Sequence, residues 1–164
     1  MARVSSDQPL VPSVLDRLLD DQPQSQRESP KSRTQVLREL KQSLRRDLEN
    51  LLNTRRRCKS WPAHLEELEV SLVNYGLPDI TGAHLSGAAN REEFQRVLEE
   101  VVRRFEPRFK NVAVEMLSAA DPLDRVLRFR IDALVEAEPA PEPVAFDSAV
   151  RPVSGAVEVI GARR

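Results

Sequence analysis

The chain has few of the residues on which the chemistry of many small proteins depends. Its 164 residues include one cysteine, two histidines, one tryptophan and one tyrosine. The lone cysteine, Cys58, cannot form an intramolecular disulfide, which fits a reducing compartment. Its arginine-rich surroundings indicate a solvated thiol. His64 and His84 lie among no cysteines and share no ligand spacing, so we expect neither a metal site nor a cofactor.

No sign of charge dominates, and no long apolar run is present. Lys and Arg number 25 against 26 Asp and Glu, which leaves a net charge of −1. Such a balance gives the chain no overall electrostatic attraction to nucleic acid or to an anionic membrane. Nowhere do about 18 consecutive apolar residues appear, and the stretch from Met1 to Ser13 has no apolar core of signal-peptide length. The sequence therefore predicts a cytoplasmic protein without a nucleic-acid partner and without direct membrane insertion.

Apolar spacing predicts the helices. Leucines and valines at three- and four-residue steps predict one helix from Lys31 to Thr54. Asn90 is the expected cap of a second long helix, with Glu93 three residues on as in a capping box. Its apolar stripe comprises Phe94, Val97, Leu98, Val101, Val102 and Phe105. A short helix is expected at Val14–Leu19, and another between Leu65 and Val73.

A change of period predicts strands in the last third of the chain. Apolar and polar residues alternate from Val112 to Leu117 and again from Leu127 to Glu136, separated by a turn at Asp121–Asp124. A terminal hairpin is expected from Val144–Val150 and Ala156–Ile160. The fold class is α+β, with N-terminal helices packed on one face of a small C-terminal antiparallel β-sheet. We expect a short helix and flexible linker at 1–33, with the linker at Asp21–Ser32, one domain at 34–160 and a tail at 161–164.

The segment Phe105-Glu106-Pro107-Arg108-Phe109 is the most informative motif. Proline disfavours helical geometry in the residue before it, so the second long helix should end near Glu106 and an extended segment should begin. Glu106 and Arg108 would then project outward from one side of a stiff corner, because residues two apart in extended chain point the same way. Phe105 and Phe109 would anchor that corner.

Four motifs in this order resemble the TssE family, the small baseplate subunits of the bacterial type VI secretion system, related to a wedge protein of contractile phage tails. They are Arg45-Arg46-Asp47-Leu48-Glu49-Asn50-Leu51-Leu52-Asn53-Thr54-Arg55-Arg56, Tyr75-Gly76-Leu77-Pro78-Asp79-Ile80, Phe105-Glu106-Pro107-Arg108-Phe109 and Arg128-Phe129-Arg130-Ile131-Asp132-Ala133. The resemblance covers nearly the whole chain, from about Val14 to Ile160.

The resemblance implies a structural role without catalysis. Glu106, Pro107 and Arg108 would dock onto the wedge subunits TssF and TssG, with TssK in the larger complex. The C-terminal strands would interlock with the contractile sheath, TssB and TssC, so that the protein links the baseplate to the sheath and helps to start sheath assembly.

Two other functions are consistent with the residues alone. A peptidoglycan-cleaving, lysozyme-like glycoside hydrolase needs two carboxylates across a sugar-sized cleft, one of them held protonated. Glu106 is the candidate acid, yet its arginine neighbours favour the ionised form, which is the wrong form for a proton donor. Asp79 and Glu115 are the candidates for the second carboxylate. The other function is that of a soluble adaptor that binds a regulatory protein.

The basic run Arg55-Arg56-Arg57-Cys58-Lys59 beside Trp61 is a weak signal for nucleic acid. Basic residues with one aromatic define no recognised nucleic-acid fold. A solvated helix end explains the run more simply, since cations complement the negative end of the helix dipole. A contact with an acidic surface of the wedge is the second interpretation.

Overall fold

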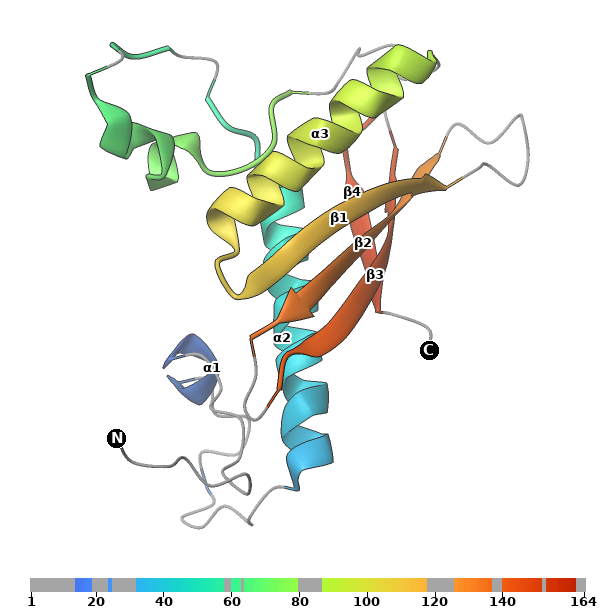
Figure 1. The fold of residues 1–164 in the computed structure, drawn as a ribbon. Coiled ribbons are helices and arrows are strands. Elements are labelled where there is room, and N and C mark those ends of the chain that lie inside the picture. Colours follow the sequence, from blue (N-terminus) through green and yellow to red (C-terminus); the bar gives the residue numbers. More distant parts are fainter. Residues whose placement is uncertain are drawn as a thin grey trace.

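Helices come first along the chain and strands come last. The computed structural model describes residues 14–18, 24, 32–57, 60–62, 64–79, 87–117, 126–136, 140–151 and 153–161. The helices are α1 (Val14–Leu18), α2 (Arg33–Asn53) and α3 (Ala88–Phe105), and the strands are β1 (Phe109–Leu117), β2 (Leu127–Val135), β3 (Glu142–Val150) and β4 (Val157–Gly161) (Figure 1). The predicted α+β class is confirmed. The turn at Asp121–Asp124, Cys58, His84 and nearly all of the linker lie outside the described residues.

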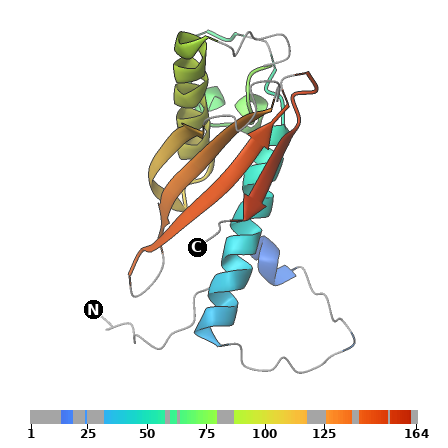
Figure 2. The same ribbon diagram turned by 90° about the vertical axis from the view of Figure 1, so that its right-hand side faces the viewer.

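The helix α2 forms where its apolar spacing predicts. Ser32 caps its N-terminus, because its hydroxyl accepts a hydrogen bond from the backbone N–H of Gln35 at 3.3 Å. The C-terminal half of α2 lies against the sheet, whereas its N-terminal half diverges from the strands and has α1 alongside (Figures 1 and 2). The buried leucines of this helix are Leu44, Leu48, Leu51 and Leu52.

The helix α3 buries the predicted stripe but begins earlier than expected. It starts at Ala88, and Gly87 occupies the N-cap position without a side-chain hydrogen bond. The predicted cap at Asn90 is therefore wrong, because Asn90 already lies within the first turn. Four residues of the stripe are buried and two are half-buried: Phe94, Leu98, Val101 and Val102, then Val97 and Phe105.

The four strands form one antiparallel sheet in chain order, β1-β2-β3-β4. Alternate residues of β2, including Phe129 and Ile131, are fully buried, while the opposite face carries Arg130 and Asp132. Both long helices pack on the buried face, with α3 along β1 and α2 along β4 (Figures 1 and 2). The sheet thus has one covered face and one charged face, as the alternation predicts. The first strand begins at Phe109, three residues before the predicted start, and its register shifts between Lys110 and Ala113.

The segment between α2 and α3 differs from the predicted short helix. It contains two short 3₁₀ segments, Glu66–Glu69 and Leu72–Asn74. Apolar residues that suggested a buried helical face, such as Val70 and Leu72, are exposed. The apolar pattern was therefore a poor guide here, since these side chains do not reach the core.

The Tyr-Gly-Leu-Pro motif fastens this segment to the end of α2. The backbone N–H of Leu77 donates to the carbonyl of Thr54 at 2.9 Å, and Arg56 N–H donates to the carbonyl of Leu77 at 2.9 Å. Gly76 has φ +106°, and a Cβ there would lie 2.3 Å from the Thr54 carbonyl oxygen. Only glycine permits both this backbone angle and this close approach.

We predict that Gly76→Ala lowers the free energy of unfolding by at least about 1–3 kcal/mol, because the strained angle and the backbone clash add together. Gly161→Ala is the matched control, since a Cβ at Gly161 meets no atom within 4 Å. Chemical denaturation measures both variants. Equal midpoints for the two would contradict the role assigned to Gly76.

Side chains from the two helices close both outer edges of the sheet. On β4, the Asn53 amide donates to the carbonyl of Val157 at 2.7 Å and accepts from its N–H at 2.9 Å, and Arg45 donates to the carbonyl of Val159 at 2.8 Å. On β1, Glu99 accepts from Val114 N–H at 3.0 Å, and Arg103 donates to the carbonyl of Val112 at 3.3 Å. Such contacts protect edge strands from unwanted pairing.

We predict that Asn53→Ala costs about 1–3 kcal/mol of stability, because it leaves two backbone groups of the buried Val157 without partners. Asn50→Ala, the same substitution on an exposed position of α2, should cost little. Hydrogen exchange should be faster at Val157 in the first variant only. An unchanged exchange rate there would reject the assignment of Asn53 as an edge cap.

Candidate functional site

The corner between α3 and β1 forms as the proline predicts. The helix ends at Phe105, and Glu106 follows as its C-cap with φ −122° and ψ 78°. The N–H of Phe109 donates to the carbonyl of Glu106 at 3.1 Å, which closes a turn through Pro107 and Arg108. Phe109 is buried and its ring lies 6.1 Å from that of Phe146, so the strand side of the corner is anchored in the core.

The two charges of the corner do not both face solvent. Glu106 is only 6% exposed, so the prediction that its carboxylate projects outward is wrong. The carboxylate turns back onto Arg108, whose Nε and Nη2 atoms lie 2.5 and 2.6 Å from its two oxygens. A two-point contact of this kind is the strongest geometry available to a guanidinium and a carboxylate. Pro107 is the exposed residue at the apex of the turn.

Arg108 also reaches a second carboxylate, which the sequence interpretation missed. Its Nη2 atom donates to Asp47 of α2 at 2.6 Å. The pKa of Arg108 is raised, chiefly by the hydrogen bond to Glu106 and further by Asp47, although burial opposes the shift. One guanidinium thus joins α2 to the α3–β1 corner.

The ion-pair cluster continues from Asp47 to α1. Arg46 lies 3.6 Å from Asp47 and 2.8 Å from Asp16. Asp16 also accepts from the hydroxyl of Ser43 at 2.7 Å. The hydrogen bond to Asp16 is the main cause of the raised pKa of Arg46. The helix α1 is therefore held on α2 by its polar side, while Leu15 and Leu18 remain exposed.

Tyr75 brings a third motif to the cluster. Its ring packs edge-on against Phe105, with ring centroids 5.3 Å apart. Burial raises the pKa of Tyr75, and the negative charges of Asp47 and Glu106 raise it further. Three of the four motifs that carry the TssE resemblance thus meet at one place, through Asp47, Tyr75 and the Glu-Pro-Arg corner.

The arrangement of the carboxylates does not suit glycoside hydrolysis. Glu106 and Asp47 both bind Arg108, whose guanidinium takes the position that a substrate would need between them. Asp79 and Glu115, the candidates for a second carboxylate, are exposed. Two of the arginine neighbours of Glu106 in the sequence, Arg103 and Arg104, bond elsewhere, to the carbonyl of Val112 and to Glu100.

The described residues contain no group of three histidine, cysteine or carboxylate side chains that could hold a metal ion. In the same part of the chain, no helix has the length and apolar character needed to cross a bilayer.

The first arginine of the basic run, Arg55, donates to the carbonyl of Leu52 at 3.0 Å and to that of Gly155. Arg55 therefore caps a carbonyl at the C-terminus of α2 and joins it to the β3–β4 turn. Arg57 is exposed.

The fold and this site define a small α+β domain whose principal charged cluster is used to hold its own elements together. The chain belongs to the baseplate wedge protein gp25 family, whose model matches residues 38–140. Its role is that of a structural baseplate component. Among solved structures, it is similar to a chain of "The baseplate complex from the type VI secretion system", with 24% identity, 67% of this chain and 93% of that chain covered, and a TM-score of 0.46. No curated protein matches the chain.

We predict that Arg108→Ala destabilises the domain by about 2–4 kcal/mol, because it leaves the buried Glu106 carboxylate without its counter-ion. The double variant Glu106→Gln with Arg108→Met should recover part of this loss, since no unpaired charge remains. Arg130→Ala is the control, because it removes a surface pair with Asp147 on the exposed face of the sheet. Denaturation of the three variants tests the assignment, and an Arg108→Ala protein as stable as Arg130→Ala would reject it.

Proposed function

We propose that this baseplate component docks onto the wedge subunits TssF and TssG through the Glu-Pro-Arg corner and connects the baseplate to the contractile sheath in the cytoplasm. The observation that carries the proposal is the rigid presentation of Pro107. The ion pairs of Arg108 fix the conformation of the turn, and Pro107 is exposed at its apex. A surface held in its bound shape before binding loses little conformational entropy on association.

The roles of the three motif residues differ in this proposal. Glu106 is buried and acts through Arg108, so it positions the corner without touching a partner. Arg108 remains 29% exposed at its side chain and can still offer guanidinium N–H groups to an acceptor. Pro107 supplies a stiff apolar contact without a backbone donor.

The connection to the sheath is assigned to the C-terminal strands, and the structure limits where a strand can join. On β4, both backbone groups of Val157 bond to Asn53 and the carbonyl of Val159 bonds to Arg45, so these groups are not open to a further strand. β3 is longer than β4, since Gly161 lies opposite Phe146. Residues 142–145 therefore have no strand beside them on that side within the described part of the chain.

The experiment is co-purification of the chain with TssF and TssG, followed by counting sheaths in cells that carry the same variant. Pro107→Asp should abolish co-purification and sheath formation, because it places a charge at the centre of the contact. Its unfolding midpoint should change little, since the residue is exposed and the loss of a proline from a turn costs about 0.4–1 kcal/mol.

Arg96→Glu, an exposed charge reversal on α3, is the control and should retain both activities. Normal wedge binding by Pro107→Asp would exclude the corner as the docking surface. A variant that binds the wedge normally yet forms no sheaths would separate the two parts of the proposal.

A further inference from the structure

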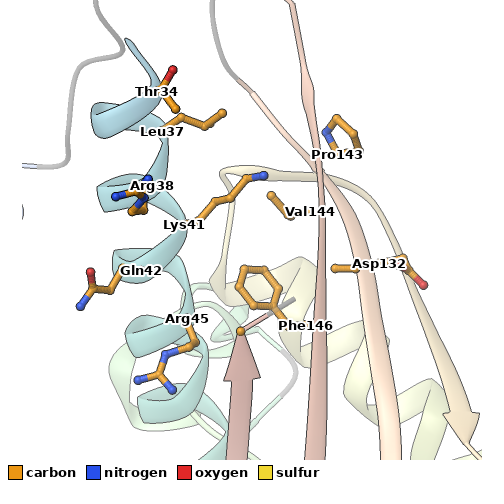
Figure 3. A pocket seen from close by; sticks show the side chains of 12 residues that line it. Thr34, Leu37, Arg38, Lys41, Gln42, Arg45, Asp132, Pro143, Val144 and Phe146 are labelled. Atoms are coloured by element: carbon orange, nitrogen blue, oxygen red, sulfur yellow. The ribbon is translucent and has the colours of Figure 1, made fainter. Parts of the chain in front are cut away.

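A groove separates the N-terminal half of α2 from the start of β3. Figure 3 shows the side chains that line it. Its volume is about 790 Å³. Val144 and Phe146 line it from the covered face of β3, and Pro143 and Ala145 line it from the opposite face. A hollow lined from both faces of a strand lies at the edge of that strand. This is the stretch of β3 that extends past the end of β4.

The groove offers backbone hydrogen bonds along this edge. Alternate residues of an antiparallel strand direct their backbone groups to the same side. Because Val157 and Val159 direct theirs away from β3, the residues of β3 that face β4 are Asp147 and Ala149, and the next ones in phase are Ala145 and Pro143. Ala145 therefore offers an N–H and a C=O at the open edge, whereas Pro143 offers only a C=O. Elsewhere the helices close the sheet edges with side chains such as Asn53 and Glu99. No hydrogen bond of that kind to residues 142–145 is found within the described residues, so this edge is available to an extended segment.

The wall formed by α2 is positively charged. Arg38, Lys41 and Arg45 follow at three- and four-residue steps and line the groove. Leu37 and Lys41 extend from α2 toward β3 (Figure 3). Lys41 is half-buried and has no ion pair with any described carboxylate. A partly buried ammonium group without a counter-ion favours a ligand that supplies a carboxylate.

One further ion pair bounds the groove. Arg33, in the first turn of α2, lies 3.5 Å from Glu142 at the first residue of β3. The opposite end is bounded by Gly161, where the described part of β4 stops. The open stretch is thus four residues long, which corresponds to about 13 Å of extended chain.

We propose that this groove binds an extended, acidic segment of a partner protein, which adds as a short strand to residues 142–145 of β3. Carboxylates on one side of the segment face Lys41 and its neighbours, and apolar side chains on the other side pack on Leu37 and Phe146. The inference rests on the proposed function, because it names the place and the chemistry by which the C-terminal strands receive a partner. The chain's own residues Ala162-Arg163-Arg164 are a poorer occupant, since their two cations would meet the cations of α2.

The probe for this site is a labelled synthetic peptide of alternating glutamate and valine, with the matching lysine–valine peptide as its control. The acidic peptide should bind the full chain saturably and shift backbone amide signals of residues 142–146 and of the first half of α2. The lysine peptide should not bind. Lys41→Glu and Arg38→Glu should each weaken the acidic peptide by roughly tenfold, because the complementary charge is reversed.

Arg57→Glu is the matched control, because it reverses an exposed cation outside the groove and should leave binding unchanged. An equal loss of affinity in Arg57→Glu would mean that net charge alone explains the weaker binding, which would overturn the proposal. Shifts elsewhere in the protein, or no binding, would overturn it as well. Binding only after removal of residues 162–164 would assign the groove to the chain's own tail instead. None of these results depends on the corner, so a failure here is distinct from a failure of wedge docking by Pro107→Asp.

Discussion

The carboxylate of Glu106 is buried at the point where the last helix turns into the first strand, and it must remain paired. Its partner is Arg108, which also binds Asp47 and so brings α2 to the corner. An isolated buried charge is too costly to keep, so each element that supplies a member of the cluster is held in place by the others. The exposed position of Pro107 follows from this requirement.

The two long helices cover one face of the sheet and also cap its two edges. Asn53 imitates a neighbouring strand by both donating to and accepting from Val157. Glu99 and Arg103 bond to β1 in a comparable way. If a partner adds a strand as proposed, these caps would direct it to the uncapped start of β3.

The helices and strands that have a regular apolar pattern could be predicted from the sequence. α2, the stripe of α3 and the alternation of β2 follow from the burial of one face, which leaves a regular apolar pattern. The burial of Glu106 could not be predicted, because the cluster depends on Asp47, 61 residues before Arg108. The short helix predicted between Leu65 and Val73 was wrong for a related reason. A local apolar pattern does not reveal whether its side chains can reach the core. Asn90 satisfied a capping pattern, but the helix had already begun at Ala88.

The contact of Asn53 with Val157 spans 104 residues of sequence. During synthesis α2 leaves the ribosome long before its partner strand exists. At about 5–20 residues per second, that interval is roughly 5–20 seconds. Throughout this time the leucine face of α2 lacks the strand that packs along it, so the nascent chain passes through a stage at which chaperone binding or premature association competes with folding. The last strand to be made is the one that ends this exposure.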